Sequence, residues 1–336
     1  MSDLICAECG TPLNESNVHY FAGNAYCSEC LDDLTVCCTR CGDRIFRDDA
    51  CYRHDSSDEP YCEDCIGCND DESGEDIHGY YYKPTPIFHG DGNRFFGVEL
   101  EIDEAGECDS YAAKILDIGN DRANNIYCKH DGSLNDGFEI VTHPMTLNYH
   151  LHEMPWADIL DKARAMGYYS HQAHTCGLHI HVNRTAFGKT ETEQDAAIAR
   201  ILFFVERNWN ELLTFSRRTQ RQLERWAARY GYKDDPAEIL EHAKKGRVDR
   251  YTCVNITNEH TIEFRIFRGT LKYNTLIATL QMVNRICDLA YFLSDTEIRN
   301  LSWPEFVASV KEPELIQYLK ERRLYVSEPV ESEEEI

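Results

Sequence analysis

The stretch CGLHIHVNR, residues 176–184, alternates apolar and polar side chains. In a β-strand, successive side chains point to opposite faces, so the apolar residues of this stretch would share one face. His179 and His181 would then share the other face. The stretch therefore predicts a strand over 177–183 with two imidazoles on its polar face, and leaves open what they hold.

The same alternation recurs elsewhere, so we expect further strands beside this one. Glu99 and Glu101 share a face in RFFGVELEID, Glu263 and Arg265 share one in TIEFRIF, and Glu139 lies in FEIV. The expected strands cover 94–103, 125–131, 137–143, 177–183, 250–257 and 261–267. The expected helices cover 109–120, 146–166, 191–216, 217–230, 236–245 and 273–293, followed by a short pair that begins at Ser302. Strands and helices without a steady alternation predict an α+β domain.

The polar face of this sheet would collect several carboxylates, two imidazoles and an Arg. Any single pair of polar residues on a half-exposed strand is more often a solvated face than a site. Several carboxylates on one surface, however, repel one another unless cations lie between them. Oxygen ligands with an imidazole suit Mg²⁺ or Mn²⁺, and a neighbouring Arg suits phosphate.

The N-terminal part of the chain is rich in cysteine, with 11 of the 16 cysteines in residues 1–68. C-x2-C-G followed by Y-C-x2-C occurs twice, which is the spacing of tandem zinc ribbons or of a LIM-type double knuckle. The expected ligands of one zinc ion are Cys6, Cys9, Cys27 and Cys30, and those of a second are Cys38, Cys41, Cys62 and Cys65. A disulfide scaffold is the less favoured alternative. Residues that could replace a ligand are Cys37, Cys51, Cys68, His19 and His54.

Charge and hydropathy restrict the partners of the chain. The 336 residues carry a formal charge of -25, and residues 1–76 hold 19 Asp or Glu against four Arg and no Lys. Such acidity disfavours nucleic acid as a partner and favours a protein or peptide for the cysteine-rich arm. No apolar run is long enough for a membrane span, and MSDLICAECG does not resemble a signal peptide. We therefore expect a soluble, cytoplasmic protein without membrane contact.

Composition divides the chain into four parts. We expect a zinc domain over 1–68, an acidic Gly- and Pro-punctuated linker over 69–93, a larger domain over 94–325 and a disordered acidic tail over 326–336.

Four motifs in the larger domain carry a family resemblance. They are FGVELEID (96–103), KHDGSLNDGFEIVTHP (129–144), CGLHIHVN (176–183) and RYTCVNITNEHTIEFRIFRGTL (250–271). In this order they resemble the amidoligase (carboxylate-amine ligase) family, whose catalytic domain is similar to glutamine synthetase and glutamate-cysteine ligase. The resemblance covers about 94–295. It implies a curved, mostly antiparallel sheet with outer helices, whose concave face binds ATP and two divalent metal ions.

The resemblance also implies roles for individual residues. Glu101 and Glu139 would bind the metal nearer the substrate carboxylate. Glu99, His179 and Glu263 would bind the metal that bridges the ATP phosphates. Further implied contacts are His181 with the phosphates, Arg265 with the transferred phosphoryl group, and Asp131 and Arg268 as additions to the site. The implied reaction transfers a phosphoryl group from ATP to a carboxylate, and an amine then attacks the acyl phosphate to form an amide or isopeptide bond.

One further segment, SRRTQRQLERWAARYGYK, places an Arg at every fourth position of an expected helix. The stripe comprises Arg217, Arg221, Arg225 and Arg229, and would cap the nucleotide, attract an acidic substrate or form a solvated face. Arg250 and Tyr251 could also line the cleft.

His150 and His152 lie on an expected helix and are interpreted as surface residues.

Three classes of function remain open. The first is the ATP-dependent ligase, with an ATP-dependent phosphotransferase as its variant. The second is a zinc hydrolase in which His179 and His181 bind the metal and Glu263 activates water, although the strands offer no third nitrogen ligand. The third is a non-catalytic adaptor. We favour the ligase, acting on a carboxylate and an amine, with the zinc arm recognising a protein or peptide.

Overall fold

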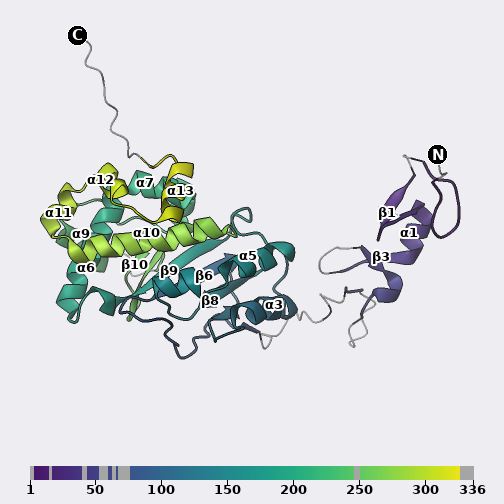
Figure 1. Ribbon diagram of the computed structural model, residues 1–336, viewed down its shortest axis with the longest axis horizontal. Helices are drawn as coiled ribbons and strands as arrows, with labels where there is room; N and C mark the ends of the chain where they lie inside the picture. Colours follow the sequence, from purple (N-terminus) through teal and green to yellow (C-terminus); the bar gives the residue numbers. More distant parts are fainter. Residues whose placement is uncertain are drawn as a thin grey trace, which may run out of the picture.

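The computed structural model of the chain describes residues 4–14, 17–39, 44–52, 60–62, 66, 76–245 and 250–325. The larger part contains a sheet of seven strands (Figure 1). In spatial order the strands are β10 (Val254–Asn255), β11 (Thr261–Arg268), β9 (Gly177–Asn183), β6 (Phe96–Ile102), β8 (Phe138–Thr142), β7 (Ile126–Lys129) and β5 (Ile77–His78). Of these strand pairs, only β5 with β7, at one edge of the sheet, is parallel. The sheet is therefore mixed and mostly antiparallel.

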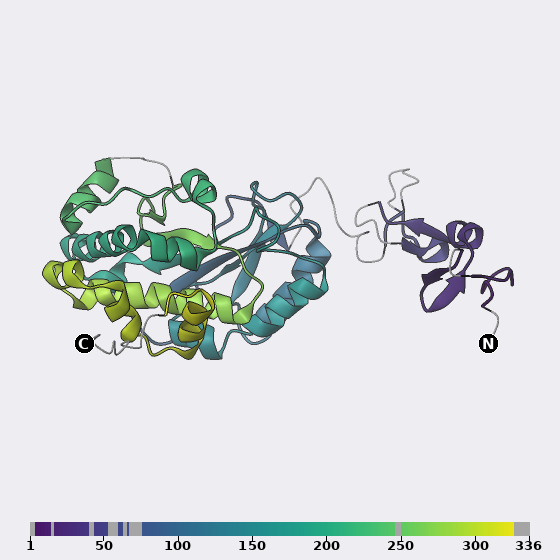
Figure 2. The same ribbon diagram turned by 90° about the horizontal axis from the view of Figure 1, so that it is seen from above.

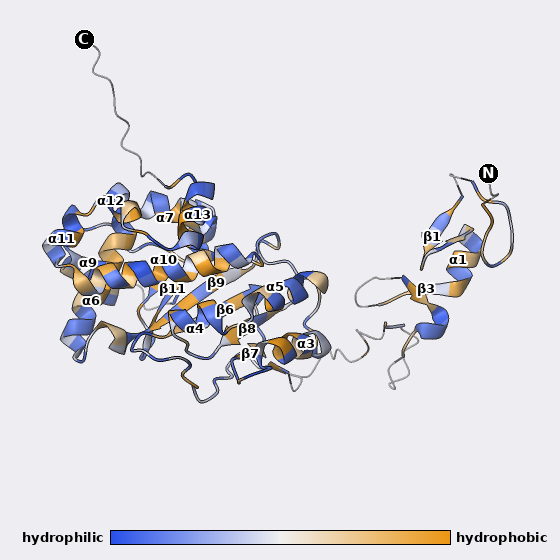
Figure 3. Cartoon of the chain, in the orientation of Figure 1, coloured by the Kyte–Doolittle hydropathy of each residue, from blue (hydrophilic) through white to orange (hydrophobic). Residues whose placement is uncertain are grey.

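The alternation seen in the sequence places one apolar face of the sheet in the core. Val98, Leu100, Ile180 and Val182 are fully buried there, in one large apolar cluster. Figure 3 shows hydrophobic and hydrophilic residues mixed along the strands of this sheet. Because alternate residues point the other way, the carboxylates and imidazoles of the same strands share the opposite face.

Helices cover the apolar face of the sheet. The N-terminal half of the domain contributes α3 (Asp109–Gly119), α4 (Leu147–His152), α5 (Trp156–Ala165), α6 (Glu191–Arg207), α7 (Trp209–Ser216) and α8 (Gln220–Trp226). The remainder contributes α9 (Pro236–Lys245), α10 (Tyr273–Phe292), α11 (Asp295–Asn300), α12 (Trp303–Ala308) and α13 (Pro313–Glu321). Helix α10 packs against α4, α5, α6 and α13, and α5 and α10 lie on the same side of the sheet (Figures 1 and 2). None of the helices in the described ranges has the length and apolar character needed to cross a bilayer.

Several predicted helices are shorter than the sequence suggests. The predicted helix 146–166 is two helices, α4 and α5, because Pro155 interrupts the backbone hydrogen bonds between them. The predicted helix 191–216 is divided into α6 and α7 at Asn208. Helix α11 was not predicted, and β10 keeps only two residues of the predicted strand 250–257.

The predicted linker 69–93 is wrong from Ile77 onward, where the chain is part of the larger domain. Ile77 and His78 form β5, which pairs with the Cys128–Lys129 end of β7. The Ile77 N–H donates to Asp109 Oδ1 at 2.9 Å, and further along, the His89 N–H donates to the Pro144 carbonyl at 3.0 Å. A two-residue strand is too short to leave a period in the sequence, so composition alone assigned this segment to a linker. The predicted tail, 326–336, lies outside the described residues.

The cysteine-rich part has its own small fold. It contains β1 (His19–Phe21) paired with β2 (Asn24–Tyr26), helix α1 (Ser28–Leu34), and β3 (Thr35–Cys37) paired with β4 (Arg44–Phe46). Its described core consists of two small clusters, one of Cys6, Leu13, Tyr26 and Leu31 and one of Cys38 and Tyr61. A core of this size is rarely enough to stabilise a domain without a metal or disulfides.

Candidate active site

The sheet register brings the predicted site residues together from four strands. Glu99 on β6 lies opposite His179 on β9, and Glu101 on β6 lies opposite Glu139 on β8. On the other side of β9, Glu263 of β11 lies opposite His181. Directly opposed residues of paired strands have neighbouring side chains, so the register forms one polar cluster on the open face of the sheet.

His179 lies between two groups of carboxylates. Its Nδ1 atom is 3.4 Å from Glu99 Oε2 and 3.8 Å from Glu263 Oε1. Its Nε2 atom is 3.7 Å from Glu101 Oε1, and Glu139 completes this second group. Within each group of three residues, the potential ligand atoms lie within 4.8 Å of one another.

The donor set of each group fits a hard divalent cation, because two carboxylates and one imidazole suit Mg²⁺ or Mn²⁺. The two groups correspond to the two ligand sets expected from the family resemblance, with one difference: His179 belongs to both.

The cluster is electrostatically strained, as its pKa shifts show. Burial, together with the charge of Glu99, raises the pKa of Glu139 well above its usual range, although the Lys129 ammonium lies 3.0 Å away. Burial would also raise the pKa of Glu99, but His181 and His179 hold that pKa well below its usual range. For His181, burial lowers the pKa, and Glu99 and Glu263 more than reverse this effect. Nearby positive charge stabilises the ionised carboxylates of this cluster. Bound cations would also supply such charge.

All of the cluster except Glu101 lines the floor of a cleft of about 800 Å³, on the open face of the sheet. Arg265 is buried in this floor, where its guanidinium donates to Glu263 and lies under the Tyr251 ring, 5.8 Å from the centroid. Asp131 and Arg250 also line the cleft, as the sequence suggested for Asp131, Arg250 and Tyr251.

A second cavity of about 360 Å³ adjoins the cleft on the side of Glu101. The two cavities share His179, Arg265 and Tyr251, and the smaller one also contains Arg218. Arg218 was not predicted as a site residue from the sequence.

Arg218 is held by its Nε–H, which donates to the Phe267 carbonyl at 3.2 Å. Gly177 makes room for it, since a Cβ there would come within 2.7 Å of an Arg218 terminal nitrogen and 2.6 Å of His179 Nε2. Burial lowers the pKa of Arg218 to about 10, opposed by Glu101, so the side chain stays charged at neutral pH. The glycine at the first position of the predicted strand 177–183 was the one sequence signal for a close neighbour at this point.

Lys129 is a second residue that the sequence analysis missed. It pairs with Glu139, and Glu139 and Glu99 raise its pKa despite its burial. Its place in KHDG, two residues before the end of the predicted strand 125–131, could have marked it as the cationic partner of a neighbouring carboxylate.

Two predictions about arginine residues are wrong. Arg268 lies at the end of β11, where its guanidinium contacts His174 Nδ1 at 2.9 Å and the Arg217 carbonyl, and it does not line the cleft. The arginine stripe does not form because helix α8 covers only Gln220–Trp226. Arg217 precedes it in a left-handed conformation with φ 61°, and Arg229 follows it and pairs with Glu206 at 2.9 Å.

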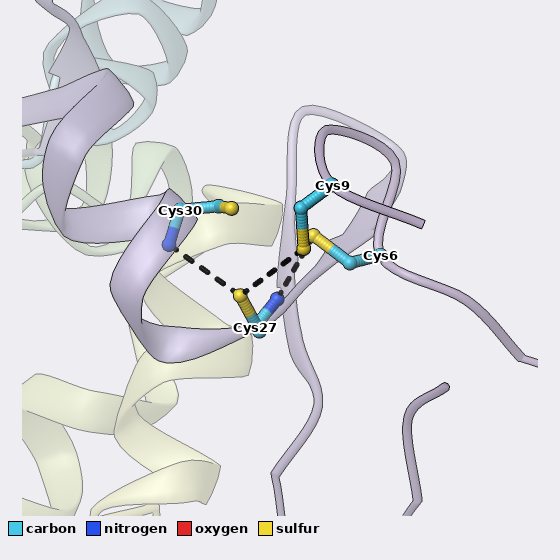
Figure 4. Close-up of side chains that lie close together, drawn as sticks. All are labelled: Cys6, Cys9, Cys27 and Cys30. Atoms are coloured by element: carbon cyan, nitrogen blue, oxygen red, sulfur yellow. Dashed lines mark hydrogen bonds between the residues drawn. The ribbon is translucent and has the colours of Figure 1, made fainter. Parts of the chain in front are cut away.

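The first cysteine set also comes together (Figure 4). The Sγ atoms of Cys6, Cys9, Cys27 and Cys30 all lie within 4.8 Å of one another, with 3.9 Å between those of Cys9 and Cys27. Tetrahedral zinc with Zn–S bonds of about 2.3 Å needs sulfur atoms about 3.8 Å apart. Backbone N–H groups of Cys9 and Cys27 lower the pKa of Cys6 to about 6, which favours the thiolate form that binds metal. This cluster can hold zinc.

The second cysteine set is only partly described. Cys38 is buried beside Tyr61 and Cys62, whereas Cys41 and Cys65 lie outside the described residues, as do Cys68 and His54. Of the alternative ligands, His19 is exposed on β1 and is not among the residues of the first cluster.

Comparison with known proteins identifies the family. A family model described as "putative amidoligase enzyme" matches residues 115–287, about half of the chain. The chain belongs to this amidoligase family. The match includes Glu139, His179, Glu263 and Arg265, and it supports an enzyme of the ligase type. No curated protein matches the amidoligase chain.

The zinc hydrolase alternative requires His179 and His181 to bind one ion. Among the described residues, neither group of potential ligands on the sheet includes His181. Its Nε2 atom is instead 3.2 Å from Glu99 Oε1, and its Nδ1 atom is 3.1 Å from Thr261 Oγ1. The geometry therefore disfavours the hydrolase.

Proposed function

We propose that this amidoligase is an ATP-dependent carboxylate-amine ligase whose catalytic domain has a glutamine synthetase-like fold. The observation that carries the proposal is the pair of ligand groups that share His179, next to the buried guanidinium of Arg265 and on the floor of a cleft. Phosphoryl transfer needs cations and an Arg around the phosphate oxygens more than it needs a nucleophile from the protein.

The large cleft would take the nucleotide. Glu99, His179 and Glu263 would hold one Mg²⁺ or Mn²⁺ ion, and Glu101 and Glu139, with His179, would hold the second. The two ions, when bound, would neutralise the phosphate oxygens and polarise the γ-phosphoryl group. Arg265 would contact the phosphoryl group in transfer, and His181 would lie beside the phosphates.

The smaller cavity would take the carboxylate substrate. It meets the cleft at His179 and Arg265, where the γ-phosphoryl group would arrive, and Arg218 adds a positive charge to its wall. The substrate oxygen would attack phosphorus, ADP would leave, and an amine would then displace phosphate from the acyl phosphate to form the amide.

A covalent route through cysteine is disfavoured. Cys176 is the cysteine of the His-strand motif, and burial raises its pKa well above the usual range of a thiol. A protonated, buried thiol is a poor nucleophile.

The cysteine-rich arm would bind two structural zinc ions and recognise a protein or peptide. Its acidity motivates this part of the proposal. A surface of one charge sign speeds the encounter with an oppositely charged partner. The arm would therefore favour a basic partner.

The nucleotide site can be tested without knowing the substrates. Mg·ATP is titrated calorimetrically into the full zinc-loaded chain, into Glu263→Gln and into Glu238→Gln, which changes an exposed acid on α9 as a control. We expect Mg²⁺-dependent binding to the native chain and the control, and none to Glu263→Gln. A folded native chain that does not bind Mg·ATP would refute the ligase.

The phosphotransferase variant uses the same geometry, so only turnover separates it from the ligase. ADP release is measured with pooled carboxylates, with and without pooled amines. A ligase forms an amide and needs both pools for the product, whereas a phosphotransferase leaves a stable phosphorylated product with one substrate alone.

A further inference from the structure

We propose that residues 80–86, with Tyr127 on β7, form the wall that receives the base of the nucleotide. This inference rests on the proposed function, because it identifies which part of the same cleft holds which end of ATP. The segment lies before residues 115–287, so the family match does not supply it.

The segment is fixed at both ends. On its N-terminal side, the His78 carbonyl accepts the His130 N–H at 2.8 Å, within the β5–β7 pairing. On its C-terminal side, the Ile87 N–H donates to His143 Nδ1 at 3.4 Å. Between them, the rings of His78 and Tyr82 are stacked with centroids 3.6 Å apart, and the Tyr82 N–H closes a turn onto the Gly79 carbonyl at 2.9 Å. The wall therefore has a defined position over the sheet.

The lining of the cleft includes two chemically different sets of residues. One set is Glu99, Glu139, His179, Glu263 and Arg265, described above. The other is aromatic and apolar apart from Lys83 and Thr142, and comprises with them Tyr80, Tyr81, Tyr82, Pro84, Pro86, Tyr127, Val141, His143 and Pro144. A ligand that satisfies both sets has a flat ring at one end and a polyanionic tail at the other, which describes a nucleoside triphosphate.

The tyrosines of the wall have different roles. Tyr80 is occupied, since Arg250 and Lys129 lie over its ring at 5.6 Å and 5.9 Å from the centroid. Tyr82 packs edge-to-face on Tyr127 with centroids 5.6 Å apart, yet 38 % of its surface remains exposed, and Tyr81 is 88 % exposed. Exposed aromatic surface that lines a cleft is the usual platform for a planar ligand. Tyr82 and Tyr127 therefore offer the base its main contact.

The test compares Mg·ATP with Mg·tripolyphosphate, which has the phosphate chain but no base. Both are titrated calorimetrically into the full chain, Tyr82→Ala, Tyr82→Phe and Tyr81→Ala. Tyr291→Ala changes an exposed tyrosine on α10 and is the matched control. We expect Tyr82→Ala to weaken Mg·ATP binding by about tenfold, the loss typical of one aromatic contact, and to leave tripolyphosphate binding unchanged. Tyr82→Phe and the control should bind both ligands like the native chain.

The outcomes separate this inference from the proposed function. If the native chain binds both ligands with equal affinity, or if Tyr82→Ala and Tyr81→Ala weaken neither, the wall does not hold the base while the phosphate site stands. If Tyr82→Ala weakens both ligands equally, it acts through the position of the segment, and the base contact is refuted. If the native chain binds neither ligand, the proposed function and the base wall both fail.

Discussion

The two ligand clusters of this chain are built on opposite principles. The first set of four cysteines in the arm gathers around a described core that consists of Cys6 and three apolar residues. The carboxylates and His179 gather on a sheet whose other face belongs to an apolar cluster that runs through the whole larger domain. In the arm, the metal would hold the fold together, whereas in the domain the fold holds the ligands together.

This difference follows from the energies involved. Binding of a structural zinc ion contributes about 10 to 16 kcal/mol in isolated zinc fingers, more than a core of a few residues can. Buried carboxylates that repel one another reduce stability, so a sheet that carries them must be stable for other reasons. Ligand substitutions should therefore unfold the arm but leave the domain folded and inactive.

The largest expected effect is the loss of an arm cysteine. Cys9→Ser should release one zinc ion and unfold the arm, because about 10 kcal/mol of binding energy is lost and little core remains. Zinc content and limited proteolysis of residues 1–68 measure this effect. Ser28→Ala changes an exposed neighbour of Cys27 and is the control. An arm that stays protease-resistant without zinc would show that its fold does not depend on the metal.

The second prediction concerns Glu139→Gln in the domain. The pKa of Glu139 is raised by burial and by Glu99, so its charge is already unfavourable there. The neutral amide should leave the thermal midpoint of the metal-free domain unchanged or higher. Loss of a metal ligand should lower ligase turnover by more than about 100-fold. A loss of about 100-fold is the largest that is typical when the changed residue only hydrogen-bonds to a metal ligand.

The same variant has a binding readout. Mg²⁺ should raise the thermal midpoint of the native domain, by mass action, and raise that of Glu139→Gln much less. Glu238→Gln should respond like the native chain. A large loss of stability in metal-free Glu139→Gln would show that this carboxylate is structural.

The sheet and much of the site could be predicted because alternation is a local property. Strand β9 has the predicted bounds, 177–183, and helix α9 has the predicted bounds, 236–245. Glu99, Glu101, Glu139, His179 and Glu263 follow the same alternation, so each could be placed on the polar face of its strand. The order of the strands, which was not predicted, brought them within ligand distance. Which of them would share a metal ion was implied only by the family resemblance.

The remaining features depend on contacts that are distant in sequence. Strand β5 exists through its pairing with β7, and Arg218 reaches the site from the turn between α7 and α8. The arginine stripe failed because the backbone turns at Arg217, where a periodic pattern still fits a helix. His150, interpreted as a surface residue, is fully buried on α4.

The third prediction concerns the pH dependence of folding stability in the larger domain. His150 Nε2 donates to the Phe96 carbonyl at 3.1 Å and Nδ1 accepts the Trp156 indole N–H at 3.3 Å, so the ring is held neutral. Burial lowers the pKa of His150 to about 4. The unfolded chain takes up a proton below about 6.5, so folding stability should fall as pH decreases from about 6.5 to about 4, by up to about 3 kcal/mol in total.

This effect can be separated from acid release of zinc in the arm. His150→Gln keeps one donor and one acceptor but does not titrate, so its denaturation free energy should depend less on pH than that of the native domain. His152→Gln alters an exposed residue of the same helix and should keep the native dependence. Equal slopes for the two variants would exclude His150 as the origin.

The smallest expected effect is on substrate affinity. If the domain holds its site groups without help from ligands, a change at the edge of the site should alter binding and not folding. Arg218 lines the smaller cavity, and within the described residues no hydrogen bond from the protein occupies its terminal nitrogens. Arg218→Gln should therefore raise the KM for the carboxylate substrate about tenfold, as expected for one charged hydrogen bond, with kcat and the thermal midpoint little changed. Arg221→Gln, which changes an exposed Arg three residues away, should leave KM unchanged. An equal fall in kcat and in thermal stability for Arg218→Gln would mean that Arg218, like the cysteines of the arm, is needed to hold its surroundings in place.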